Sequence, residues 1–174
     1  MNDIRLLKAG EIQVKVKQVT SKGCLLLLYK DARVDMSILD ETFGKGNWQC
    51  EYKIIGDALY CGIGIFNKEI NQWVWKWDCG IESRADGEGN EKKGEASDAF
   101  KRAGFKIGIG RELYTSPFIW ARVPTEQDGK GKWVLKDKYA KFTVDTIDYD
   151  KDRNIVALLI KDQNGQTVYK GHKE

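Results

Sequence analysis

The sequence predicts an α+β fold in which an antiparallel β-meander packs on a central helix, with a smaller β-meander near the C-terminus. Three alternating segments, at about 48–55, 58–66 and 72–79, follow one another with short polar turns between them. An amphipathic helix is expected after them, at about 90–108. Strands followed closely by such a helix favour a sheet that the helix covers on one face.

A strand and a shorter helix are expected before the meander. Residues 12–19 (IQVKVKQV) alternate between apolar and polar side chains, which is typical of a strand with one solvated face. The apolar run at 24–29 either extends this strand or begins a helix. A helix is predicted at about 31–43, because Asp31 can cap its start and Gly44 can end it. Its apolar positions are three or four residues apart: Val34, Ile38, Leu39 and Phe43.

The predicted helix at 90–108 has one apolar side, and small residues there let it lie close to a sheet. That side is formed by Ala96, Ala99, Phe100, Ala103 and Ile107. Basic residues surround it, with Lys92, Arg102 and Lys106 on one border, Lys93 near the other, and Lys101 towards solvent. This helix therefore combines a packing surface with a high local density of positive charge.

The last third of the chain is expected to be β-structure. Strands are predicted at about 118–123, 132–135, 141–148, 154–160 and 166–170. The dipeptide Asn164-Gly165 marks a hairpin turn between the last two of them. We therefore expect residues 1–139 to form the main unit and residues 140–174 to form a small β-meander added to it.

Length and composition are those of a folded, water-soluble protein. The 174 residues are 41% hydrophobic and 32% charged, which is ordinary for a globular domain. The longest apolar run, Cys24 to Tyr29, is too short to span a bilayer. The N-terminal residues lack the apolar stretch of a secretory signal. We expect a cytoplasmic protein without a membrane partner, in the host cytoplasm if a phage encodes it.

Positive charge is concentrated in the middle of the sequence. Residues 92–141 contain 12 Lys and Arg against 6 Asp and Glu, whereas the chain as a whole has a net charge of only +3. Such a local excess is typical of a surface that binds a polyanion such as nucleic acid. A lysine-rich solvated face would give the same pattern, and charge alone does not separate the two interpretations.

No pattern in the sequence indicates catalysis or a bound cofactor. The phosphate-binding string GxxxxGK[ST] is absent, which argues against ATP-driven strand exchange. The only histidine is His172, and the four cysteines form no CxxC pair, so neither a histidine-based triad nor a zinc site is expected. A two-metal nuclease site could draw on Asp78, Glu82 and Glu95, although their spacing follows no nuclease motif. We predict a non-enzymatic protein without metal.

Three tryptophans alternate along the segment predicted as the third strand of the meander. Trp73, Trp75 and Trp77 share one face of that strand with Cys79. We interpret this stripe as part of the core or of a subunit interface, so that Trp75→Ala would lower stability or disperse an oligomer. The alternative is a platform on which nucleobases stack.

Two segments resemble a known family. The first, YKDARVDMSILDETFGKGNWQ (Tyr29 to Gln49), resembles the first helix and following turn of Rad-fifty-two-type single-strand annealing proteins. The second, KKGEASDAFKRAGFKIGIGRELY (Lys92 to Tyr114), resembles their central helix and, in its ending, the phage and bacterial branch. Both segments occur in the family's order, and the resemblance covers roughly residues 12–123.

The resemblance implies a β-β-β-α core whose copies assemble into rings or filaments, with single-stranded DNA in a basic groove. By position, Arg33 matches a groove arginine, and Lys101 and Arg102 match a lysine–arginine pair of the central helix. We expect these three residues to contact phosphates. A second group of expected contacts comprises Lys93, Lys45 and Arg111. Lys45 stands where eukaryotic members have an aromatic residue, so it would bind phosphate and not stack on a base.

The resemblance implies ATP-independent binding and annealing of single-stranded DNA in homologous recombination and double-strand break repair, in a phage or a bacterium. The expected partners are single-stranded DNA, further copies of the chain, and a single-strand-binding protein or an exonuclease. Three other hypotheses stay open: a protein that protects single strands without annealing them, a metal-dependent nuclease, and a structural protein that recruits others through the C-terminal meander.

Overall fold

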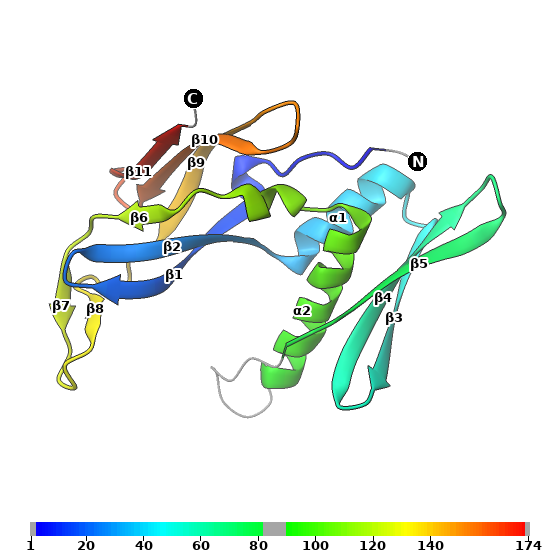
Figure 1. The fold of residues 1–174 in the computed structure, drawn as a ribbon, viewed down its shortest axis with the longest axis horizontal. Coiled ribbons are helices and arrows are strands. Elements are labelled where there is room, and N and C mark those ends of the chain that lie inside the picture. The colour runs from blue at the N-terminus through cyan, green and yellow to red at the C-terminus, as the bar shows by residue number, and fades with distance from the viewer. Residues whose placement is uncertain (1–2, 82–89, 173–174) are drawn as a thin grey trace. The chain divides into compact units, whose positions relative to one another are not determined.

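The computed structural model describes residues 3–81 and 90–172, except for the side chains of residues 90–93. In this part of the chain the protein is an α+β fold of mostly antiparallel strands with two α-helices, as the sequence predicted (Figure 1). The chain divides into two compact units. We call them the helix–meander unit, Met1–Arg5 with Asp31–Gly110, and the six-strand unit, Leu6–Lys30 with Arg111–Glu174.

The helix–meander unit contains a three-stranded antiparallel sheet and both α-helices. Its elements are α1 (Ala32–Phe43), β3 (Trp48–Ile55), β4 (Ala58–Asn67), β5 (Gln72–Cys79) and α2 (Asn90–Ile107). The strand order is β3-β4-β5, so β4 is central and β5 forms one edge. All five elements lie within one or two residues of the predicted ranges, because each is bounded by local turn or capping signals.

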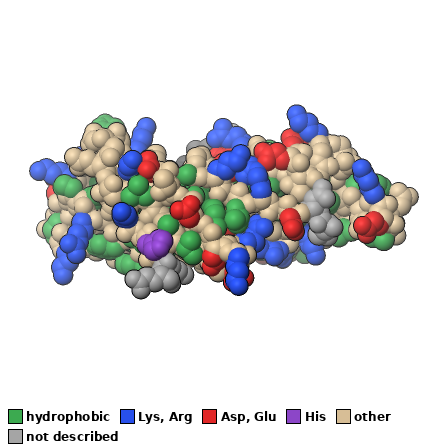
Figure 2. All heavy atoms as spheres, turned by 90° about the horizontal axis from the view of Figure 1, so that it is seen from above, with side chains coloured by type: hydrophobic (Ala, Val, Ile, Leu, Met, Phe, Trp, Pro, Cys, Tyr) green, Lys and Arg blue, Asp and Glu red, His purple; other side chains and the backbone are tan. Residues whose placement is uncertain are grey.

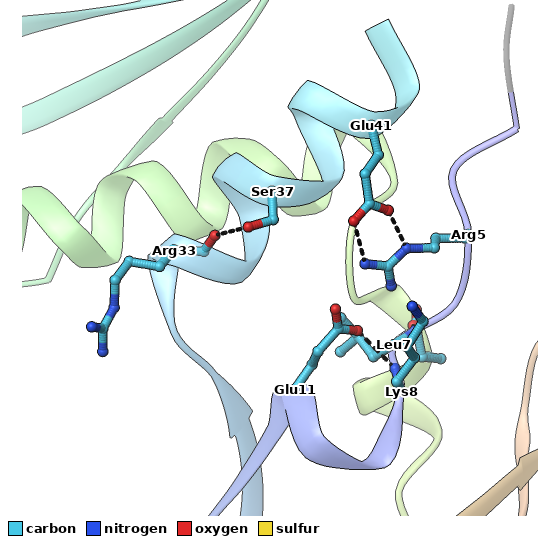
Figure 3. A network of polar contacts seen from close by, with 8 residues as sticks. Arg5, Leu7, Lys8, Glu11, Arg33, Ser37 and Glu41 are labelled. Carbon is cyan, nitrogen blue, oxygen red and sulfur yellow. Dashed lines mark hydrogen bonds and ion pairs between the residues drawn. The ribbon is translucent and has the colours of Figure 1, made fainter. Parts of the chain in front are cut away.

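Helix α1 begins and ends where its capping residues predict. The Asp31 carboxylate accepts a hydrogen bond from the Arg33 backbone N–H at 2.8 Å, which satisfies one of the free donors at the helix start. Gly44 ends the helix with a φ of 84°, a conformation that glycine adopts at little cost, and its N–H bonds to Asp40 O. Arg5 of the N-terminal segment forms an ion pair with Glu41 of this helix (Figure 3).

Helix α2 packs against β4 and β5 and covers one face of the sheet. The Phe100 ring lies 6.2 Å from the Trp48 ring of β3, and Ile63 in the middle of β4 is fully buried. The approach is closest at Gly80, because any Cβ at this position would clash with the backbone O of Glu95 in α2. Ala99 and Ala103 of the predicted apolar side are fully buried as predicted, whereas Ala96 and Ile107 are only partly buried.

The six-strand unit is a nearly closed, barrel-like antiparallel sheet in the order β11-β10-β9-β1-β2-β6. Its strands are β1 (Ile12–Thr20), β2 (Gly23–Lys30), β6 (Ile119–Ala121), β9 (Phe142–Tyr149), β10 (Ile155–Asp162) and β11 (Thr167–His172). A separate hairpin consists of β7 (Thr125–Gln127) and β8 (Trp133–Leu135). The core of the unit contains Leu26, Ile119, Phe142, Leu158 and Ile160.

Long-range strand pairing decides two points that the sequence left open or divided differently. The apolar run at 24–29 belongs to strand β2, which pairs with β1 in a hairpin. The C-terminal meander is present, but its first strand β9 pairs with β1, so it shares a sheet with the N-terminal hairpin. The predicted boundary between residues 139 and 140 falls inside the six-strand unit, between β8 and β9.

A polar network fixes the segment around Leu7 within the six-strand unit. Leu7 N–H donates to Glu112 Oε1 at 2.7 Å, and Tyr149 Oη–H donates to Leu7 O at 2.9 Å. Burial, with the nearby Glu112 charge, raises the pKa of Tyr149, so its hydroxyl stays a donor. Over the residues that the structure describes, no helix has the length and apolar character needed to cross a membrane.

Candidate nucleic-acid interface

The predicted DNA-contacting residues divide between the two units. Arg33, Lys45, Lys101 and Arg102 lie in the helix–meander unit, whereas Arg111 lies in the six-strand unit. Lys93 falls in the first turn of α2, outside the side chains that the structure describes. The helix–meander unit by itself therefore contains most of the predicted interface.

Arg33 projects into solvent from the first turn of α1 (Figure 3). Its side chain is 84% exposed, and its guanidinium donates two hydrogen bonds to the Asp31 carboxylate, at 2.9 and 3.0 Å. These hydrogen bonds lower the pKa of Asp31 to about 2, so the carboxylate stays charged at neutral pH. Arg33 is thus a solvent-facing cation held in place by a capping carboxylate.

Lys101 of α2 lies near the start of α1. Its positive charge helps to lower the pKa of Asp31, alongside the larger contribution from Arg33. Two basic residues that are 68 positions apart in the sequence therefore share one acidic neighbour. The structure brings together these two predicted contacts, one from each helix, and we call Asp31, Arg33 and Lys101 the α1 cluster.

Arg102 belongs to a different cluster, although it follows Lys101 directly. Successive residues of a helix point about 100° apart, and Arg102 is directed towards the sheet. Its Nε lies 3.6 Å from Asp78 Oδ1 of β5, and Lys106 Nζ lies 3.6 Å from the other oxygen of the same carboxylate. Lys106 also donates a hydrogen bond of 2.6 Å to Trp77 O. We call Asp78, Arg102 and Lys106 the β5 cluster.

In the β5 cluster, one carboxylate faces two basic side chains beside an edge strand. Asp78 is only 18% exposed, whereas the side chains of Arg102 and Lys106 are 37% and 51% exposed. Arg102 Nε makes no hydrogen bond, so its attraction to Asp78 comes from charge alone. The two cations therefore remain accessible to an anion from solution.

The structure adds Lys106 and Asp78 to the predicted set. Lys106 stands four residues after Arg102, a spacing that places two side chains on the same helix face. Asp78 alternates with the tryptophans of β5, a pattern that places it on the opposite, helix-covered face. Both signals were present in the sequence, but only the packing of α2 on β5 shows that they meet.

The remaining two predicted residues are exposed and belong to neither cluster. Lys45 is in the turn between α1 and β3, between Gly44 and Gly46. Arg111 begins a 3-10 turn, Arg111–Thr115, in the six-strand unit. On the face drawn in Figure 2, basic side chains lie among acidic and hydrophobic ones and do not merge into a single patch.

The tryptophan stripe lies on the face of the sheet that α2 leaves uncovered. Trp75 and Trp77 pair across the strands with Gly64 and Gly62 of β4, and their rings lie over those glycines. Trp73 packs edge-on against Phe66 and is 37% exposed. The stripe is therefore not the core beneath the central helix. Its place in a subunit interface stays a prediction.

The acidic residues considered for a nuclease site have other partners. Asp78 belongs to the β5 cluster, and Glu95 accepts a hydrogen bond from Leu59 N–H at 3.2 Å. Glu82 lies outside the described residues. Within the described part of the chain, no group of three His, Cys, Asp or Glu residues is arranged to hold a metal ion.

No protein-family model, curated protein or solved structure was found to match the chain. The resemblance of the two sequence segments to Rad-fifty-two-type proteins therefore stays an expectation from the sequence. The features that bear on function are the α1 cluster and the β5 cluster of the helix–meander unit.

Proposed function

We propose that the protein binds single-stranded DNA through the helix–meander unit and anneals complementary strands without ATP. The observation that carries this proposal is the pair of basic clusters to which α2 contributes, each with one carboxylate and two basic side chains. The order of β3, β4, β5 and α2 agrees with the β-β-β-α core that the resemblance implies.

The carboxylates Asp31 and Asp78 would hold the basic side chains ready for phosphate. Ion pairs between exposed groups contribute little to stability, about 0–1 kcal/mol. A DNA phosphate can therefore replace Asp31 as the partner of the exposed Arg33 at small cost. Binding of this kind releases counterions from the DNA and weakens steeply as salt rises. It needs no base sequence, which suits a protein that must accept any strand.

Annealing requires many weak contacts along one strand. One helix–meander unit offers only a few cations, whereas copies arranged in a ring or filament would repeat them along the DNA and add their affinities. We therefore propose a homo-oligomer as the active form. A single-strand-binding protein or an exonuclease in the same recombination reaction would supply or process the strand.

The proposal is tested by replacing the neighbouring bases of the two clusters, Lys101→Ala with Arg102→Ala. The double variant should keep its fold, bind a labelled oligothymidine more weakly at moderate salt, and anneal more slowly. The slope of log affinity against log salt should fall by roughly 1.4, at about 0.7 per lost phosphate contact to a single strand. Fluorescence anisotropy at several salt concentrations measures both quantities.

The matched control removes two exposed lysines from the β7–β8 hairpin, Lys130→Ala with Lys132→Ala. This variant loses the same charge and should bind like the wild type. Arg33→Ala should weaken binding in the same direction as the α2 variant, with about half its change in slope. Equal affinity of the wild type and the α2 double variant at moderate salt would contradict the assignment of the interface.

A further inference from the structure

Two tryptophans of β5 lie over glycines on the open face of the meander sheet, and we call Trp75 and Trp77 the indole platform. A Cβ built on Gly62 would lie 2.5 to 2.6 Å from three atoms of the Trp77 ring. A Cβ built on Gly64 would lie 2.9 to 3.0 Å from the same three atoms of the Trp75 ring. Each tryptophan ring therefore lies over its partner glycine, on the open face of the sheet.

Gly62 and Gly64 have no side chain, and this leaves the space in which the two rings lie. Any other residue at position 62 or 64 would push its partner ring away from the sheet, because its Cβ would overlap the ring. The two rings stack on each other with an offset, since their centroids are 5.6 Å apart and their planes are inclined by 26°. One face of each ring contacts the sheet, and helix α2 lies on the other side of that sheet.

Positive charge borders the platform on two sides. Lys53 of β3 places its ammonium 4.5 Å from the centroid of the Trp77 ring, and this side chain is 56% exposed. On the other side of edge strand β5, Lys106 donates a hydrogen bond to the backbone O of Trp77, and Asp78 attracts Arg102. The β5 cluster lies on the opposite face of the sheet, and Lys106 reaches from that face to the backbone of Trp77.

This combination matches a ligand in which planar rings alternate with negative charges. Unpaired nucleobases stack on aromatic side chains irrespective of sequence, and their phosphates pair with nearby cations. A second copy of the chain is a less suitable partner for the indole platform than a single strand of nucleic acid. The cores of subunit interfaces are depleted of charged residues, whereas the charged pair of Glu51 and Lys53, 3.0 Å apart, borders the rings directly.

We propose that the indole platform is a base-stacking site, on which Trp75 and Trp77 hold unpaired bases of a single strand while Lys53 moves from the Trp77 ring to a phosphate. The inference rests on the proposed binding of single-stranded DNA and specifies a site that the basic clusters alone do not provide. Bases held face-on against indoles would be spread along the protein and accessible at their pairing edges.

Photo-crosslinking of the unaltered protein is the first test. An oligothymidine in which single positions are replaced by 5-iododeoxyuridine is bound at low salt, irradiated at a long wavelength, and the crosslinked peptide is identified by mass spectrometry. The expected crosslinks map to Trp75 or Trp77. Crosslinks that map only to residues outside β5 would overturn the proposal, even if DNA binding itself is strong.

A second test compares oligonucleotides with and without bases. The wild type should bind an oligothymidine more tightly than an abasic strand of equal length and charge, by at least about 10-fold for stacking on two indoles. Trp75→Leu with Trp77→Leu should abolish this preference and leave binding of the abasic strand unchanged. The control Trp133→Leu, in the β7–β8 hairpin, should keep the preference. Trp75→Phe with Trp77→Phe should restore most of it.

The outcomes separate this inference from the proposed function. If the wild type binds neither strand at low salt, both proposals fail. If it binds both strands equally, or if the leucine variant keeps the preference for bases, only the stacking site is refuted. A leucine variant that keeps the base preference but has a smaller mass in light scattering would overturn the proposal in favour of a subunit interface.

Discussion

The two faces of the three-stranded sheet differ in character, although the same strands form both. Under α2, strand β5 presents Asp78, whose carboxylate attracts two cations of the helix. On the open face, the same strand presents Trp75 and Trp77, which lie over glycines of β4. Because side chains alternate along a strand, the neighbouring residues Trp77 and Asp78 lie on opposite faces of the sheet.

The face under α2 is tightly packed, whereas the open face has partly exposed aromatic rings. We propose that only the open face binds bases. The covered face is closed by contacts too close for any side chain larger than hydrogen, as at Gly80. The open face also needs glycines, but there Gly62 and Gly64 leave space for aromatic rings that are partly exposed. Substitutions on the covered face should change stability first, and those on the open face should change binding first.

The largest expected effect is loss of stability in Gly80→Ala. The new methyl group would clash with the backbone O of Glu95, and backbone atoms of a packed helix cannot move aside easily. Overpacking of this kind lowers the free energy of unfolding by about 1–3 kcal/mol. Denaturant unfolding measures the change. The control Gly46→Ala adds a methyl group where no atom lies within 4 Å, and it should unfold like the wild type.

A smaller and opposite pair of effects is expected for Asp78→Asn. Loss of this carboxylate removes the acidic partner of Arg102 and Lys106, so the free energy of unfolding should fall by no more than about 1 kcal/mol. Binding of single-stranded DNA should strengthen, because the β5 cluster gains one net positive charge. Weaker DNA binding in this variant would mean that Asp78 is needed to orient the two cations, or that they do not contact DNA.

The smallest effect concerns the Asp31 carboxylate, whose contribution to stability is lost in acid. Its pKa is about 2 in the folded protein and 3.8 for an ordinary Asp, so its stabilising contribution is complete above about pH 4 and is lost as pH falls towards 2. Asp31→Asn keeps a helix-capping side chain without the charge. The stability difference between wild type and variant should narrow from about pH 5 to about pH 2.5 in denaturant titrations. Parallel curves would contradict the role of the Arg33 ion pair.

Local signals in the sequence were sufficient for the elements of the helix–meander unit. Asp31 and Gly44 define α1 by capping, and alternating side chains define β5 and its two faces. The sequence could not show which face α2 covers, because alternation gives two faces and does not distinguish them. For that reason the sequence predicts the tryptophan stripe in the core or in an interface. In the structure, α2 packs on the opposite face, which contains Ile63 and Asp78.

Pairing between strands that are distant in the sequence could not be predicted either. The run at 24–29 is apolar on both sides, so periodicity did not separate a strand from a helix, and its pairing with β1 and β6 decides the matter. Likewise, the pairing of β9 with β1 joins residues that are 130 positions apart, Gln13 and Thr143. Within the candidate interface, the contact of Arg33 with its neighbour Asp31 is local, whereas the contact of Arg102 with Asp78 depends on the fold.

Annealing itself is the most direct test of the account. Two complementary oligonucleotides, one carrying a fluorophore and the other a quencher, are mixed with the protein in the absence of ATP and magnesium. We predict that the two oligonucleotides pair faster with the protein than without it. The double variant Lys101→Ala with Arg102→Ala should lose most of this acceleration. Pairing that is slower than without protein would contradict it, since that result identifies a protein that protects single strands and does not anneal them.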